Sequence, residues 1–218
     1  AILRRLVGSE MCIRDSVTSL ASASISDIKT LLTAGNNSTN NFAATSFQSL
    51  ATVAVSDTTV SIADLNDAIT QANTATGGTT TVFSVASGAT ITTGDEAAFS
   101  TLLTNESNGN IAITDQNLTV SSGTISVDNA NLLNATTTGT VTAAIDLTED
   151  VDELATLSGT GAYTIVIASG DATGSTAAEF NTINSATTVA IDASEVTALA
   201  SSNLSDCLLY TSPSPRDV

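Results

Sequence analysis

A short pattern of helix followed by strand recurs along this chain and constrains its fold more than any other feature. Its clearest copy is STAAEFNTINSATTVAID, residues 175–192. Within it Thr176 stands three residues before Glu179, the spacing of a capping box, and apolar residues then recur every three or four positions. Residues 188–192 alternate β-branched and small side chains and end at an acid, which predicts a short strand.

Similar units return roughly every 23 to 30 residues. Strands are predicted to begin near residues 52, 80, 110, 140, 163 and 188. Helical patterns cover residues 24–32, 61–69, 95–104, 126–135, 148–157 and 194–199, and shorter β-like stretches intervene at 90–92 and 118–120. An echo between LNATTTGTV (133–141) and INSATTV (183–189) suggests that layers alternate in pairs about fifty residues apart.

Regular recurrence of this kind is typical of stacked layers, because one strand and one helix cannot bury their apolar faces until neighbours pack on them. Right-handed connections would set the strands parallel and the helices outside. We therefore predict an α/β fold, an elongated and irregular solenoid of strand-plus-short-helix repeats with a parallel sheet. The alternative is two or three small α+β or β-sandwich domains.

Composition favours thin layers over a globule. The chain has no Trp and only five Phe and two Tyr, although 42% of its residues are hydrophobic. Ala, Val, Ile and Leu therefore supply the apolar content. Such side chains suit stacked layers better than a core built around large aromatic residues.

The two ends differ from the middle. Both Cys, the only Met, both Pro and four of the five basic residues lie outside residues 17–205. The stretches GSEMCIRDS (8–16) and DCLLYTSPSPRD (206–217) resemble translated read-through of sequencing-adapter DNA. We interpret 1–16 and 206–218 as non-native tails around a repeat array at 17–205, and expect the array to be an internal fragment of a longer protein. The alternative is that both tails are genuine disordered or docking termini.

Charge excludes two kinds of partner. Residues 17–205 contain 18 acidic residues and one basic residue, Lys29. Such a field repels nucleic acid and anionic lipid, and no basic patch could neutralise phosphates. Since no long apolar run is present either, we expect no nucleic-acid binding and no membrane insertion.

An acid follows several of the predicted strands. These residues are Asp57, Asp115, Asp146 and Asp192, with Asp171 at a less regular position. Equivalent positions in adjacent layers would lie about 4.8 Å apart, so the carboxylates could form a column whose repulsion Ca²⁺ would relieve. These five Asp are our candidate calcium ligands, and the sequence suggests no cofactor other than Ca²⁺. The alternative is that each Asp forms a turn or caps a helix; neither a glycine-rich calcium-binding nonapeptide nor a D-x-D-x-D-G loop occurs.

A second acidic cluster comprises Glu149, Asp150, Asp152 and Glu153. It is another candidate location for calcium. The alternative is a helix N-terminus, where carboxylates interact favourably with the positive end of the helix dipole.

Catalysis finds little support. The chain has no His, and residues 17–205 contain no Cys or Arg, so most nucleophile, general-base and imidazole metal sites are unavailable. A carboxylate pair could cleave glycosidic bonds, but Phe83, Phe99 and Phe180 lie in apolar patterns that predict the core and not a sugar platform. We therefore expect no enzyme.

Threonine tracts at 79–81, 90–92 and 136–138 invite an ice-binding interpretation, since a flat Thr ladder could order water. The tracts do not recur at one position of the unit. We therefore attribute them to strand propensity and turn formation.

Residues 24–200 resemble the degenerate Ala/Thr/Asp-rich internal repeats of very large secreted or surface proteins of marine bacteria, grouped with calcium-dependent adhesins and repeats-in-toxin proteins. The resemblance is carried by the pattern L-N-x-x-T-T followed by a strand and Asp. It implies an extracellular or cell-surface location and a structural or adhesive role. The partners implied are neighbouring repeats of a longer parent chain, with surface glycans or proteins as further candidates.

These observations lead to three functional hypotheses. The first is a non-catalytic structural or adhesive segment of a large bacterial surface or secreted protein. The second is a calcium-stiffened binding module, and the third is a carboxylate-only glycosidase or lyase.

Overall fold

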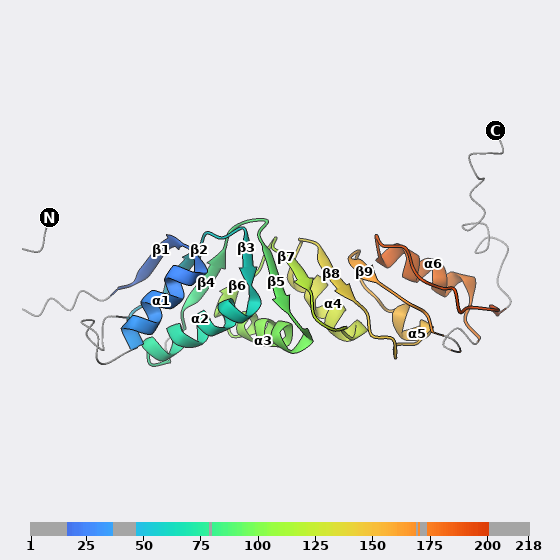
Figure 1. Ribbon diagram of the computed structural model, residues 1–218, viewed down its shortest axis with the longest axis horizontal. Coiled ribbons are helices and arrows are strands. Elements are labelled where there is room, and N and C mark those ends of the chain that lie inside the picture. Colours follow the sequence, from blue (N-terminus) through green and yellow to red (C-terminus); the bar gives the residue numbers. More distant parts are fainter. Residues whose placement is uncertain (1–16, 37–46, 79, 169, 171–173, 201–218) are drawn as a thin grey trace, which may run out of the picture.

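Two parallel sheets and a row of short helices make up the structure, so the predicted α/β class is confirmed. The structure is a computed structural model, and it describes residues 17–36, 47–78, 80–168, 170 and 174–200. The molecule is elongated, and its elements follow one another along the long axis in chain order (Figure 1). The predicted tails, residues 1–16 and 206–218, lie outside the described residues.

Successive layers contribute strands to two separate sheets. Sheet A has the order β1 (Ser19–Ala23), β2 (Thr52–Val55), β4 (Val82–Val85), β6 (Ile111–Ala112). Sheet B has the order β3 (Thr59–Ser61), β5 (Thr90–Gly94), β7 (Asn117–Val120), β8 (Val141–Ala144), β9 (Ala162–Thr164). Every neighbouring pair in both sheets is parallel. The expectation of a single sheet is wrong, because the stretches at 90–92 and 118–120 belong to strands of a second sheet.

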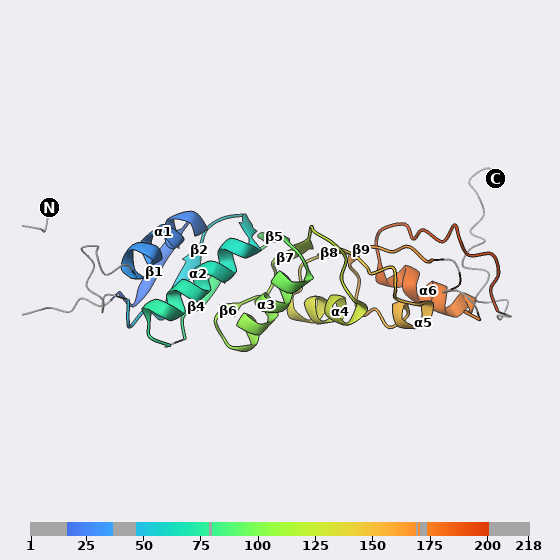
Figure 2. The same ribbon diagram turned by 60° about the horizontal axis from the view of Figure 1, so that its bottom comes forward.

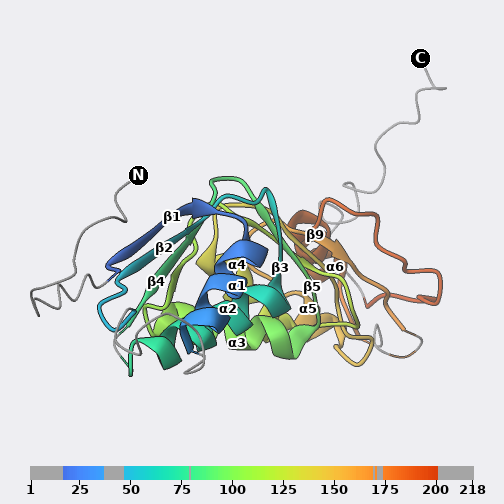
Figure 3. The same cartoon turned by 60° about the vertical axis from the view of Figure 1, so that its left-hand side comes forward.

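The helices form the third side of the molecule. They are α1 (Ile25–Asn36), α2 (Ile62–Ala75), α3 (Glu96–Ser107), α4 (Val127–Thr136), α5 (Val151–Leu154) and α6 (Ala177–Ala186). Figure 2 shows α1 to α4 following one another along the molecule, and α1 contacts α2, α2 contacts α3, and α3 contacts α4. In Figure 3 sheet A and sheet B slope down on opposite sides, and the helices lie beneath them.

Local sequence explains where these helices begin. The capping box predicted at Thr176 and Glu179 is confirmed: the Glu179 amide donates to Thr176 Oγ1, and the Thr176 amide donates to Glu179 Oε2. Asp150 and Glu153 form a second capping box at the start of α5. Because these contacts span three residues, sequence spacing alone is enough to predict them.

The core is a set of apolar columns that run from layer to layer. In sheet A, Val53 pairs with Phe83 and Phe83 with Ile111; all three are buried. Sheet B has a matching column of Val60, Ile91, Leu118 and Val141. One continuous buried cluster extends from Ile25 to Ala186. Each such side chain contributes about 1.5–3 kcal/mol by leaving water, so each layer depends on its neighbours for stability.

The layers shorten towards the C-terminus. Val53 pairs with Phe83, thirty residues later, whereas Thr142 pairs with Ala162, twenty residues later. The difference arises at α4, because the chain passes from this helix directly to β8 in sheet B and adds no strand to sheet A. The layers that begin with β2, β4 and β6 contain two strands, whereas the first layer, which begins with β1, and the layers after α4 contain one.

The fifty-residue echo corresponds to a shared contact. Thr137 and Thr187 each follow a helix in extended conformation, and each buried hydroxyl donates to a carbonyl of an earlier layer. The acceptors are the Gln116 oxygen at 2.6 Å and the Tyr163 oxygen at 2.7 Å. The hydroxyls thus satisfy buried carbonyls where a helix turns into a strand.

Two predictions at the C-terminal end are wrong. The strand expected from residue 188 is reduced to isolated bridges at Thr187 and Asp192. The helix expected at 194–199 is absent, because residues 194 and 195 form a turn and the following residues are irregular. Short amphipathic helices are stable mainly through tertiary packing, and Leu199 here is 45% exposed.

Candidate functional site

The acids predicted to follow strands lie at two different places. Asp57 and Asp115 occupy the connection from sheet A to sheet B, whereas Asp146 and Asp192 follow the strand positions of sheet B. Asp171 lies outside the described residues. The four described acids therefore do not form one column.

In the connection between the sheets, Asp57 and Asp115 are separated by a layer that has no acid. Ser87 occupies that layer, and its hydroxyl donates to Asp115 Oδ2. Asp115 also accepts from Gln116 Nε2 at 3.1 Å. The pKa of Asp115 is below its usual value, mainly because of the Ser87 hydroxyl, with smaller contributions from the Gly88 amide and the Thr114 hydroxyl. Asp57 instead accepts the Ile25 amide at 2.7 Å, so its carboxylate caps α1 of the preceding layer.

Along sheet B, Asp146 and Asp192 are likewise two layers apart. Asp192 pairs with Val166, which lies two residues beyond the pair Ala144 and Thr164. Asp146 accepts the Thr148 amide at 3.0 Å, and this backbone donor is the main cause of its lowered pKa. Asp192 accepts the Ser194 amide at 3.0 Å, and its pKa is lowered by the Ser194 side chain and backbone.

Two layers correspond to about 10 Å between equivalent backbone positions. Calcium takes six to eight oxygen ligands at about 2.3–2.6 Å, so carboxylates at this spacing need further ligands between them to share an ion. Among the residues that the structure describes, no group of three or more acidic or other metal-binding side chains is placed to hold a metal. The contacts present are those of turns and helix caps. Calcium at these Asp residues stays a prediction.

The second acidic cluster lies where α5 meets α6. Asp150 caps α5, and Asp152 faces Glu179 of α6. The negative charge of Glu179 is the main cause that raises the pKa of Asp152, and Asp150 adds to it. Burial, followed by the neighbouring Glu153, raises the pKa of Glu149. Like charges are therefore crowded at this junction, in addition to the favourable placement at a helix N-terminus that the sequence suggested.

The N-terminus of α4 is capped by carboxylates from both sides. Glu96 of the preceding layer accepts from the Ser126 amide and hydroxyl, both at 2.9 Å, and from Asn129 Nδ2 at 2.7 Å. Glu149 of the following layer accepts the Val127 amide at 3.0 Å. These bonds lower the pKa of Glu96, with Asn129 the main cause. Spacing did not reveal Glu96, because its partners lie thirty or more residues away.

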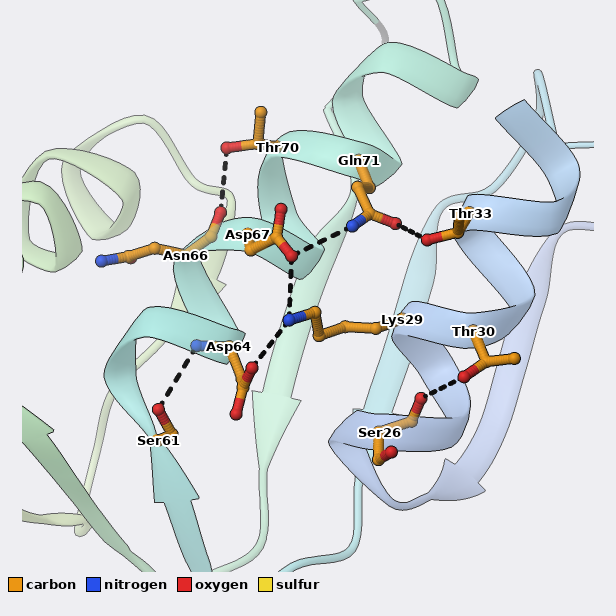
Figure 4. Close-up of polar contacts among 10 residues, drawn as sticks. All are labelled: Ser26, Lys29, Thr30, Thr33, Ser61, Asp64, Asn66, Asp67, Thr70 and Gln71. Carbon is orange, nitrogen blue, oxygen red and sulfur yellow. Dashed lines mark hydrogen bonds and ion pairs between the residues drawn. The ribbon is translucent and has the colours of Figure 1, made fainter. Parts of the chain in front are cut away.

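The one basic residue in the described part of the chain joins α1 to α2 (Figure 4). Lys29 Nζ lies 2.7 Å from Asp64 Oδ1 and 2.9 Å from Asp67 Oδ2. Gln71 extends the contact, donating to Asp67 and accepting from Thr33. The two carboxylates raise the pKa of Lys29, which keeps it cationic and unsuited to nucleophilic or general-base catalysis. A shallow depression of about 400 Å³ beside it is lined by polar side chains.

Within the described ranges, the aromatic residues provide no sugar platform. Phe83, Phe99 and Phe180 are all buried, whereas sugar sites use exposed aromatic faces. No helix in the described ranges is long and apolar enough to cross a membrane. Comparison of the chain with protein-family models, with curated proteins and with solved structures finds no match.

Proposed function

We propose that this chain is a segment of an irregular α/β solenoid that acts as a stiff, non-catalytic spacer or adhesive stalk in a large extracellular bacterial protein. The observation that carries the proposal is that nearly all contacts join adjacent layers. Strands pair with their counterparts one layer away, and Asp57, Glu96 and Glu149 cap helices of neighbouring layers. In such arrays, length grows with each repeat and stability comes from nearest-neighbour interfaces.

Two surface properties fit a stalk. The net charge of −17 disfavours association with other copies and with anionic surfaces. At the C-terminal end, an apolar depression of about 600 Å³ is lined by Phe180, Ile191, Val196 and Leu199 among others. A neighbouring repeat of the same kind would cover it, as each layer covers the one before it.

Small-angle X-ray scattering of the full chain, together with an adhesion assay on glycan-coated beads, tests this proposal. A spacer gives the pair-distance distribution of a rod and retains no beads beyond a control protein of equal charge. An adhesive stalk gives the same rod and retains beads. A globular distribution, with a single maximum near half the greatest dimension, would contradict both.

The alternatives have weaker support. Crowded carboxylates at Asp152 and Glu179 are the feature that favours a calcium-stiffened module, and a thermal melt with and without millimolar Ca²⁺ separates it from the first hypothesis. A carboxylate-only glycosidase or lyase needs two acids that face one another across a cleft, with exposed aromatic side chains beside them. This combination is not present among the described residues.

A further inference from the structure

The outer face of sheet B carries an array of threonine side chains. Thr59 pairs with Thr90 across β3 and β5, and Thr119 pairs with Thr142 across β7 and β8. The strand register produces two columns. The first contains Thr59, Thr90 and Asn117, with Thr140 beside Asn117. The second contains the pairs Ser61 with Thr92 and Thr119 with Thr142, and between these pairs the register shifts, so that Thr92 and Thr93 both lie opposite Thr119. The two columns together form what we call the threonine face.

The sequence did not reveal this face, because the face is not made of the threonine tracts. As expected, the tracts do not share one position of the repeat: Thr81 precedes β4 of sheet A, residues 90–92 lie in β5 of sheet B, and residues 136–138 lie at the end of α4. The face instead combines Thr90 and Thr92 with one threonine each from β3, β7 and β8. The alignment is hidden because the layers differ in length. Thr59 and Thr90 are 31 residues apart, whereas Thr119 and Thr142 are 23 apart.

The hydroxyls of this face are available to a partner. Thr59, Thr90, Thr92, Thr119 and Thr142 are half-buried or exposed, and none makes a side-chain hydrogen bond or other polar contact with another described residue. Elsewhere, by contrast, the buried threonines 81, 137 and 187 each donate to a backbone carbonyl. The buried threonine hydroxyls are thus bonded, whereas free ones lie on the outer side of strands, as at Thr52 of sheet A and on this face.

The threonine face is also uncharged. All five strands of sheet B lack Asp, Glu, Lys and Arg, although the chain has a net charge of −17. It presents no aromatic ring to stack on a sugar and no large apolar anchor of the kind that protein partners bury. A matching partner is electrically neutral, rich in hydrogen-bonding groups and periodic.

Strand geometry sets the spacing of the array on each side of the register shift between β5 and β7. Parallel strands lie about 4.8 Å apart, and successive outward residues on one strand are about 6.6 Å apart, twice the rise per residue. Threonine is β-branched, so χ1 is restricted and each hydroxyl and methyl group occupies a defined place. A grid of this size is similar to the spacing of oxygen atoms on a face of hexagonal ice. Methyl groups restrict the motion of nearby water, and hydroxyls bond to it.

From this grid we infer that the threonine face binds the surface of ice crystals. Water molecules held over the methyl groups and bonded to the hydroxyls continue the ice lattice. The inference does not depend on the stalk role. Scattering tests whether the chain is a rod, ice affinity tests whether it binds ice, and either result can be positive without the other.

An ice-affinity experiment on the full chain tests the inference. Ice is grown slowly from a dilute protein solution, and the protein concentration in ice is compared with that in the remaining liquid. We expect the chain to be enriched in ice several-fold over a non-binding protein of similar size and charge. Exclusion of the chain from ice to the same extent as that protein overturns the inference.

Matched variants locate the face. Thr119→Tyr, in the middle of the array, and Thr59→Tyr, on its edge strand β3, are both expected to reduce the enrichment several-fold. Ser84→Tyr, exposed on the outer face of sheet A, is the control and leaves the enrichment unchanged. Circular dichroism melts verify folding, and Thr59→Tyr remains informative if the central variant unfolds.

Three other results would overturn the inference. Equal loss in Ser84→Tyr would place binding elsewhere. Retention on crystalline cellulose or chitin without retention on ice would identify a polysaccharide as the occupant. Dimers that dissociate in Thr119→Tyr during size-exclusion chromatography would identify a second copy of the chain.

Discussion

Tyr163 is the residue with the clearest unmet requirement. Its side chain is fully buried, and its Oη has no hydrogen-bond partner among the described residues. Desolvation raises its pKa to about 12. An unsatisfied buried hydroxyl costs about 1–3 kcal/mol, which makes this layer less stable than its apolar packing implies.

Tyr163→Phe is therefore expected to raise the free energy of unfolding by about 1 kcal/mol. The variant keeps the ring that packs over Gly161 and removes only the hydroxyl. Urea unfolding followed by circular dichroism measures the difference. A loss of stability would contradict the prediction and indicate that an ordered water satisfies Oη.

Glu96 is the residue whose charge is best integrated into the fold. It accepts three hydrogen bonds from the start of α4, and its pKa is lowered. A lowered carboxyl pKa means that stability is fully present above the ordinary value of 4.5 and declines as the pH falls through the folded-state pKa.

Glu96→Gln should lower the free energy of unfolding at pH 7 by about 1 kcal/mol, a modest value because the group is partly exposed and screened. The gap from the unmodified chain should narrow as the pH falls through the lowered pKa of Glu96 and the wild-type carboxyl becomes protonated. Glu106→Gln, on the same helix, serves as the control, since no side-chain hydrogen bond to Glu106 occurs in the described structure. If both substitutions lowered the free energy of unfolding equally, the cause would be the change in overall charge and not the loss of the helix cap.

Whether a helix-capping contact can be predicted from sequence depends on how far apart its two residues lie along the chain. The boxes at Asp150 and Thr176 span three residues, so spacing identifies the start of the helix. The contact from Glu96 to Ser126 crosses thirty residues. It depends on how two layers stack, and spacing within one layer contains no information about it.

At the scale of elements, the junction of α5 and α6 brings like charges together. Asp152 of α5 faces Glu179 of α6, and this like charge raises the pKa of Asp152. The raised pKa means that the ionised carboxylate destabilises the fold at neutral pH. The penalty disappears as the pH falls and Asp152 binds a proton.

Asp152→Asn is therefore expected to raise the melting temperature at pH 7 and to have little effect at low pH, where the wild-type carboxyl is protonated. Melting curves from pH 3 to pH 8 measure this. Asp128→Asn, in the first turn of α4, is the matched control. An Asp152→Asn chain less stable than wild type at pH 7 would contradict the account.

The same variant tests calcium binding at this junction. Calcium binding is supported if millimolar Ca²⁺ raises the melting temperature of the wild-type chain but does not change that of Asp152→Asn.

Most predicted helices and most predicted strand starts are found in the structure, but the helix predicted at 148–157 is reduced to the four residues of α5. The pattern at 126–135, rich in Asn, does form α4, because Ser126 caps it and buried Val127, Ala130 and Leu133 hold it against the core. The strands of sheet B are short, and β3 has only three residues. Alternation over so few residues reveals a β-like stretch but not the sheet to which it belongs.

At the scale of the whole molecule, the layered α/β order follows from recurrence in the sequence, whereas the division into two sheets does not. The change from two strands per layer to one occurs where α4 leads directly into β8. The sequence indicates a shorter spacing between successive strands there, but it does not indicate which of the two sheets receives no further strand. For the same reason, the threonine face became visible only when the strand register was known.

The central claim is that the described layers form one stiff rod. The most direct test is the distance between spin labels at Thr30→Cys on α1 and Thr182→Cys on α6, both exposed positions, in a chain that also carries Cys12→Ser and Cys207→Ser. Stacking predicts one narrow distance distribution centred between about 25 Å, five strand spacings, and about 50 Å, five helix spacings. A broad distribution, or two separate maxima, would mean that the layers belong to independently moving domains and would contradict the claim.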